Sequence, residues 1–281
     1  MDLSVFVMVL MAAVLHASWN AFIKIDGDRI SAMAVIVFAQ AVISFALLGF
    51  VPLPTAESWP FLLVAVILHT GYRVFLSHAY RLGDLSHVYP IARGSTPLIV
   101  AVLSVTIVGE HLDRQSLVAV IIIALGIMSL ALTRGFAASR NSRAVLLALV
   151  TGCFSAAYMI VDGLGARHAV SPHSYMVWVS LLDAPPFLAY ALCLKYRTVL
   201  SIPRQRWISG CMAGVAGYMA YWIVVWALTV APMAPVAALR STSIIFAVIF
   251  GVVFLKERLN PIRLAATMAI TAGVTMLKLN K

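Results

Sequence analysis

The stretch SHVYPIARGSTPLIVAVLSVTIV, residues 86–108, carries one permanently charged side chain in a run that is otherwise suited to lipid. It is long enough to cross a bilayer as a helix, the form that keeps every backbone polar group bonded inside hydrocarbon. The charge belongs to Arg93, whose guanidinium stays protonated in proteins. Charged groups are costly in a membrane segment and mark functional sites or internal partners, so Arg93 is the first candidate site residue.

The rest of the chain has the same apolar character. Of its 281 residues, 63% are hydrophobic and 11% are charged, whereas soluble domains have about 25% charged residues. Apolar runs of about 20 residues recur from end to end and leave no stretch for a separate soluble domain. We therefore predict an all-α integral membrane protein with ten transmembrane helices, at residues 3–23, 31–51, 60–80, 86–108, 116–133, 144–162, 174–194, 207–229, 233–255 and 261–279.

Basic residues are distributed unevenly between the loops. The formal net charge is +10, but most Lys and Arg residues lie in short loops on one side of the predicted membrane. Contact with anionic lipid explains this pattern, and we expect no nucleic-acid partner. By the positive-inside rule the basic side is cytoplasmic, which places both termini outside the cytoplasm. We expect the protein in the cytoplasmic (inner) membrane as a multi-pass protein.

The sequence contains no recognisable catalytic or metal-binding motif. It has no P-loop, no HExxH and no GxSxG. Cys153, Cys193 and Cys211 lack CxxC spacing and are interpreted as small buried apolar residues. The N-terminal run has no basic segment before its apolar part, so we treat it as the first membrane helix rather than a cleaved signal peptide. We expect no enzyme activity, no cofactor and no metal.

The two halves of the sequence repeat each other. A displacement of 147 residues aligns, without gaps, Arg93 with Arg240, Glu110 with Glu257 and Gly126 with Gly273. We predict two five-helix domains, at residues 1–135 and 144–281. Because five is odd, such units insert with opposite orientations and form an inverted repeat. Many secondary transporters use this architecture to place one site near the bilayer midplane.

Each half also ends in a short motif, VGEHL at 108–112 and LKERL at 255–259, between apolar helices. In these features the chain resembles the EamA type of the drug/metabolite transporter superfamily. The resemblance implies a ten-helix carrier of small metabolites, often an exporter of amino acids or related compounds. LHASWNAFIK (15–24) together with YPIARGSTPLIV (89–100) resembles an EamA branch associated with phosphonate utilisation. The small multidrug exporters of the superfamily have an acidic residue in the first helix, where this chain has His16 and Asn20.

The two matched arginines are the main candidate ligands for a substrate. Arg93 and Arg240 each lie about 10 Å inside a helix, from opposite faces of the membrane. One guanidinium group binds two oxygens of a carboxylate, phosphonate or phosphate at once. The nearby hydroxyls of Ser95 and Thr242 are expected to line a polar cavity. Alternatively, the arginines bind backbone carbonyls, or Arg93 pairs with Asp183 within the bundle.

Arg73 lies at nearly the same predicted depth as Arg93, so the two cations favour a substrate anion or Asp183 between them. Asp183 lies at mid-membrane before Pro185 and Pro186, and is a candidate proton site, ammonium site or counter-ion to an arginine. A snorkelling Arg73 is the alternative. Asp162 lies near a predicted helix end and is expected to be solvated, while Glu110 is expected to brace the following loop.

Two aromatic and polar helix faces complete the candidate site. His16, Trp19 and Asn20 share one face of the first helix, where they donate to a ligand or bond a neighbouring helix. His16 is also a candidate for proton coupling, because histidine titrates near neutral pH. Tyr221 and Trp222 belong to an aromatic stripe that binds an ammonium group by cation–π attraction or simply packs.

The function that fits these features is a secondary transporter with alternating access. Its predicted substrate is a small polar metabolite with an anionic group, such as an amino acid or an organophosphonate. One alternative is an exporter of cationic or aromatic compounds. A second is a non-transporting membrane subunit or an enzyme of lipid head groups. The sequence leaves the formation of a homodimer open.

Overall fold

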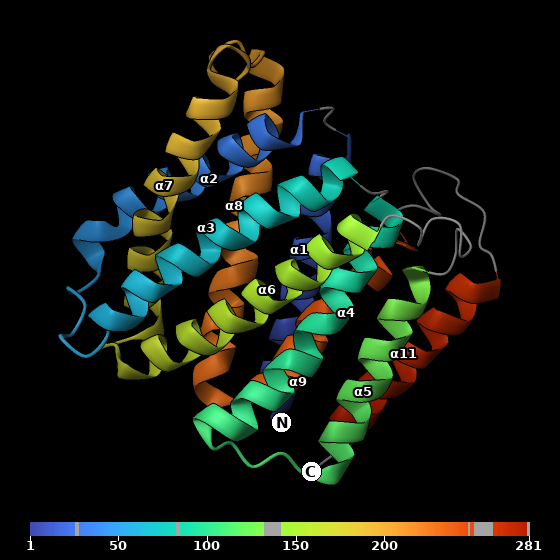
Figure 1. Ribbon diagram of the computed structural model, residues 1–281. Coiled ribbons are helices and arrows are strands. Elements are labelled where there is room, and N and C mark those ends of the chain that lie inside the picture. The colour runs from blue at the N-terminus through green and yellow to red at the C-terminus, as the bar shows by residue number, and fades with distance from the viewer. Residues whose placement is uncertain (26–27, 83–84, 132–141, 247, 250–260, 280–281) are drawn as a thin grey trace.

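The computed structural model describes residues 1–25, 28–82, 85–131, 142–246, 248–249 and 261–279. These residues form helices joined by short turns, and the described ranges contain no strand (Figure 1). The helices are α1 (Leu3–Ile25), α2 (Arg29–Leu47), η1 (Leu48–Phe50), α3 (Trp59–Leu82), α4 (Leu85–Leu103), η2 (Ser104–Val108), α5 (Arg114–Ser129), α6 (Ser142–His168), α7 (Pro172–Leu200), α8 (Arg204–Val230), α9 (Met233–Ser241) and α11 (Pro261–Leu279).

The all-helical membrane class is confirmed, and within the described residues the helices fall into two groups by length. Eight are long and apolar enough to cross a membrane, and two apolar helices are shorter, Arg114–Ser129 and Met233–Phe246. Much of the second half of the predicted helix 233–255 lies outside the described residues. The prediction for residues 144–162 was too short, because α6 continues to His168.

The helices pack in a pattern with approximate twofold symmetry. Under the repeat, the helices of the first half, α1 to α5, correspond in order to α6, α7, α8, α9 and α11. The contact of α3 with α6 therefore has its counterpart in the contact of α1 with α8, and both pairs pack in the structure. The self-equivalent pairs α2 with α7, α4 with α9, and α5 with α11 also pack.

The pair α5 and α11 shows the relative direction of the two halves. A Cβ added to Gly126 would meet Ile270 of α11, and one added to Gly273 would meet Ile123 of α5, so the contact is reciprocal. Gln115 at the start of α5 donates from Nε2 to the carbonyl of Met276, near the end of α11, across 3.1 Å. The two helices thus run antiparallel, side by side in Figure 1, as an inverted repeat predicts.

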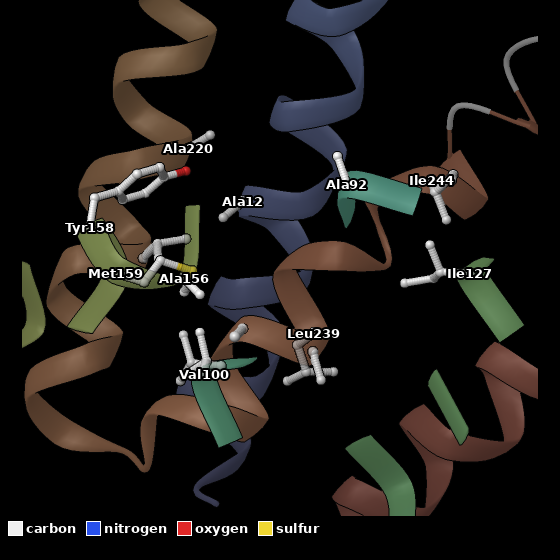
Figure 2. Close-up of a cluster of buried hydrophobic side chains, with 14 of the residues drawn as sticks. Ala12, Ala92, Val100, Ile127, Ala156, Tyr158, Met159, Ala220, Leu239 and Ile244 are labelled. Carbon is white, nitrogen blue, oxygen red and sulfur yellow. The ribbon is translucent and has the colours of Figure 1, made fainter. Parts of the chain in front are cut away.

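The core is built largely from small residues, which allow close helix approach in lipid. Figure 2 shows Ala12, Ala92, Ala156 and Ala220, which come from four different helices, in one buried cluster that also contains the larger Tyr158. Large apolar side chains are exposed on the outside, as expected for lipid contact. The cysteines were predicted to be buried, but Cys153 and Cys193 are exposed and Cys211 is partly exposed, because a small apolar side chain is equally tolerated facing lipid.

Candidate functional site

Both matched arginines lie beside a position where the regular helical hydrogen bonding is broken. In α4, Pro97 has no backbone N–H to donate to the carbonyl of Arg93, four residues earlier. In the second half, α9 ends at Ser241, Thr242 forms a turn whose N–H donates to the carbonyl of Leu239 across 3.1 Å, and helix resumes after it. Interrupted helices at membrane depth are tolerated where they border a cavity or buried protein, and they often carry transporter sites.

Arg240 is buried between two aromatic rings and has an unused donor. Its side chain is 5% exposed, and its Nη2 donates to the hydroxyl of Tyr158 across 3.0 Å. Its guanidinium carbon lies 5.6 Å from the ring centre of Tyr158 and 5.0 Å from that of Tyr221. Its Nη1 is buried and meets no acceptor among the described residues.

Arg93 contacts α1 and α3 but no carboxylate in the part of the chain that is described. Its Nη2 contacts His16 Nε2 and lies 3.3 Å from the hydroxyl of Tyr72. His16 Nδ1 also receives a hydrogen bond from Trp19 Nε1, across 3.2 Å. A neutral imidazole has only one acceptor nitrogen, so His16 cannot accept from both donors. This cluster has too few acceptors for its donors.

Asp183 pairs with Arg73, one of the partners that the sequence left open. The Arg73 Nη2 donates to Asp183 Oδ2 across 2.9 Å, and both side chains are buried. The Arg73 guanidinium carbon also lies 5.8 Å from the ring centre of Phe187. The alternative in which Asp183 pairs with Arg93 is not found.

Asp162 was expected to be solvated, and this expectation was wrong. It is 0% exposed, because α6 extends a further turn and a half beyond it and carries it into the bundle. Its carboxylate accepts from Tyr175 across 3.1 Å and from the hydroxyl of Tyr221. It also lies 2.8 Å from Nε2 of His69, whose ring stacks on Tyr158 at 4.3 Å between ring centres.

Several of these groups line a small cavity between the two halves. Its volume is about 70 Å³, and its lining includes His16, Trp19, His69, Tyr72, Arg73, Tyr158, Asp183, Tyr221 and Arg240. The remainder of its wall consists of the polar Gln40 and Ser180, of Gly217, and of the apolar Met33, Ile36, Val37, Met176 and Val179. A cavity of this size holds a few water molecules, whereas small-molecule sites span about 300 Å³ or more. The cavity is therefore smaller than a typical small-molecule site.

Five predicted site residues do not line this cavity. Arg93 lies behind His16 and Tyr72. Three others bond carbonyls of their own helices: Asn20 to His16 at 2.7 Å, Ser95 to Ala92 at 3.1 Å and Thr242 to Leu239 at 2.6 Å. Trp222 donates instead to His173, across 2.5 Å.

Five polar groups that line the cavity were not singled out from the sequence as candidate ligands: Gln40, His69, Tyr72, Tyr158 and Ser180. His69 lies four residues before Arg73 on α3, a spacing that the sequence shows, but a lone tyrosine in an apolar helix gives no signal of its own. Within the described residues, no group of three His, Cys, Asp or Glu side chains is placed to hold a metal ion.

A second polar cluster lies at the end of the bundle near Gly109. Gly109 has φ of 74°, a left-handed conformation that ends η2 and turns the chain toward Glu110. Glu110 Oε1 accepts from Arg167 Nη2 across 2.6 Å, and its Oε2 accepts from the N–H of Met233 across 2.8 Å. Arg167 also donates to the carbonyl of Leu228. The equivalent Glu257 lies outside the described residues.

Comparison with known proteins supports this architecture. One solved structure, described as "Crystal structure of protein", matches with a TM-score of 0.79 at 16% identity, over 99% of this chain and 98% of that chain. At this identity the match shows a shared fold. No curated protein matches the sequence. The model of the EamA-like transporter family matches residues 3–132 and again residues 142–279. The chain is a multi-pass membrane protein of two repeats, and it belongs to the EamA-like transporter family.

Proposed function

We propose that the protein is a secondary carrier that binds a small metabolite through its anionic group and moves it by alternating access. The observation that carries this proposal is the buried Nη1 of Arg240, which lacks an acceptor among the described residues while its side chain lines the central cavity. A buried cationic donor without a partner is costly. A substrate oxygen at this position would supply the missing acceptor.

The charges around the cavity favour an anion. The buried ionised side chains in the described part of the chain are Arg73, Arg93, Arg240, Asp162 and Asp183. Asp183 is committed to Arg73 and Asp162 to His69, which leaves Arg93 and Arg240 without a carboxylate. Guanidinium groups bind carboxylate, phosphonate and phosphate oxygens bidentately. The substrate class is therefore an amino acid, an organophosphonate or a similar small anion.

Alternating access follows from the antiparallel halves. The cavity is lined by helices of both repeats, so rocking of one half against the other opens it to one face and then to the other. In this proposal the protein lies in the cytoplasmic membrane with both termini outside the cytoplasm.

Transport into proteoliposomes tests the proposal. Labelled methylphosphonate, 2-aminoethylphosphonate, glutamate and alanine are offered to the wild-type protein and to Arg240→Gln and Arg93→Gln. We expect uptake of at least one anion by the wild type and a loss of about tenfold or more in each variant. Arg81→Gln is the matched control, because Arg81 is exposed at the end of α3. Normal uptake in both variants would overturn the proposal.

The same assay examines the alternative of a cation exporter. Labelled choline and spermidine serve as the probes. Transport of these cations, unaffected by Arg240→Gln, would favour the aromatic lining of Tyr158, Tyr221 and Trp19 as the main recognition surface, and would exclude an anion carrier.

A further inference from the structure

We propose that His69, held between two aspartates, is a proton-binding site that charges together with substrate binding, so that a dianionic substrate takes one proton into the site. The inference rests on the proposed anion carrier and adds the coupling ion and the residue that binds it.

The geometry around His69 has a place for a second N–H. Nε2 lies 2.8 Å from Asp162 Oδ2, a full hydrogen bond, whereas Nδ1 lies 3.8 Å from Asp183 Oδ2. In the neutral imidazole only one nitrogen carries hydrogen, and the short contact assigns it to Nε2. The bare Nδ1 then faces a carboxylate without a proton between them. Protonation of Nδ1 supplies a donor, and a small approach of the two groups completes a second charge-assisted hydrogen bond.

The groups around His69 come from five helices, and their charges have opposite effects on protonation of its ring. Asp162 of α6 and Asp183 of α7 favour the protonated ring. Arg73, one turn away on α3, and Arg240 of α9 disfavour it. Tyr158 and Tyr221 place their rings against His69, at 4.3 Å and 5.5 Å between ring centres. The charge of a nearby substrate is then able to determine whether His69 is protonated.

The substrate position proposed at Arg240 is separated from His69 by the ring of Tyr158. The hydroxyl of Tyr158 accepts from Arg240 while the face of the same ring stacks on His69. Tyr221 lies beneath the Arg240 guanidinium and donates to Asp162, which is the partner of His69. An anion bound at Arg240 therefore stabilises a proton on His69 by direct attraction in a region of low dielectric.

Charge balance predicts which substrates bring the proton. With His69 neutral, the three buried arginines and two buried aspartates of the described residues leave one net positive charge. A monoanion cancels this charge and needs no proton. A dianion leaves one negative charge, which a proton on His69 cancels. The proton comes from water and leaves with the substrate when the site empties, so no other reactant is required.

Calorimetric titration of the purified protein tests this inference. Heats of binding are measured in two buffers of different ionisation enthalpy, which gives the number of protons taken up per anion bound. The probes are methylphosphonate, at a pH where it is fully dianionic, and methanesulfonate, a permanent monoanion of similar size. We expect about one proton per bound methylphosphonate and none per bound methanesulfonate in the wild type.

The variants separate His69 from protonation of the phosphonate itself. In His69→Gln we expect methylphosphonate to bind more weakly. The methylphosphonate that still binds should take up no proton. His78→Gln is the control on the same helix, because His78 bonds the carbonyl of Val74 and does not line the cavity. Proton uptake that persists in His69→Gln, or is absent in the wild type, overturns the coupling inference while anion binding stands. Absence of binding by every anion overturns the carrier proposal and this inference with it.

Discussion

Arg167 Nη2 donates to Glu110 Oε1 across 2.6 Å, and this pair joins the last turn of α6 to the loop that precedes α5. Glu110 also accepts from the first N–H of α9, and Arg167 donates to the last turn of α8. Four segments from both repeats are thus bonded at one end of the bundle. Such a cluster stabilises the packing of these four segments at that end.

Replacement of Glu110 by Gln removes the ion pair while keeping the side-chain shape. We expect a loss of about 1–2 kcal/mol in stability, since the pair is partly exposed, read as a lower melting temperature in detergent. Glu57→Gln is the control, because Glu57 is exposed and meets His168 only at 3.4 Å. Equal melting temperatures for both variants would contradict the role of Glu110.

Replacement of Arg240 by Lys keeps the charge and removes the planar fork. We expect methylphosphonate to bind about tenfold more weakly to Arg240→Lys than to the wild type, because an ammonium cannot bind two phosphonate oxygens in parallel. Arg240→Gln should show no binding. Ligand-dependent melting shifts measure both, and Arg81→Lys should retain wild-type affinity. Full affinity in Arg240→Gln would exclude Arg240 as a ligand.

The contact of α5 with α11 is sensitive to single methyl groups. Alanine at Gly273 places Cβ 2.6 Å from Ile123 and 3.0 Å from the backbone oxygen of Ala119, whereas alanine at Gly126 meets Ile270 at 2.9 Å. We expect both substitutions to destabilise, by about 1–3 kcal/mol, with Gly273→Ala the worse. Thermal unfolding measures the difference. Gly49→Ala has open space and should be near neutral; a comparable loss there would argue against this packing.

Removal of one hydrogen-bond donor to Asp162 tests how much the stability of the protein depends on that bond. Tyr175→Phe leaves the buried carboxylate with one bond fewer, and we expect a loss of about 1–3 kcal/mol in stability. Tyr196→Phe is the control, since Tyr196 is 62% exposed. Unfolding in denaturant compares the two, and a neutral Tyr175→Phe would mean that Asp162 does not need this donor.

Thiol labelling tests the orientation in the membrane. In a variant whose native cysteines are replaced by Ser, Glu57→Cys should react in intact cells with a membrane-impermeant maleimide. Ser201→Cys, in the turn after α7, should react only after lysis, because the positive-inside rule places it in the cytoplasm. The reverse pattern would invert the predicted topology.

The sequence predicted the helical membrane class and the pairing of the two halves, because run length and repeat spacing are local properties of the chain. It also singled out Arg93, Arg240 and Asp183, and all three are buried. The breaks in helical hydrogen bonding beside the arginines were only partly foreseeable. Pro97 is visible in the sequence, but the turn at Thr242 contains no proline or glycine.

The partner of each charge depended on the rotation of the helices, which composition does not determine. Asp183 faces Arg73, and Arg93 lies behind His16 and Tyr72, although Arg73 and Arg93 were predicted at similar depth. The role of Asp162 was missed because α6 continues beyond the predicted end, and the true end rests on the tertiary contacts of Arg167 with α8 and Glu110. Ser95 and Thr242 bond their own helices, an option that hydroxyl groups always have in a helix.

The contacts of Gly126 with Ile270 and of Gly273 with Ile123 have the geometry of an isologous dimer interface, in which one surface patch meets a copy of itself. Here both copies belong to one polypeptide. A single five-helix chain with this patch, inserted in both orientations, would form the same contact between two separate molecules. The internal symmetry of the protein thus gives one chain the kind of interface that a dual-topology homodimer forms between two.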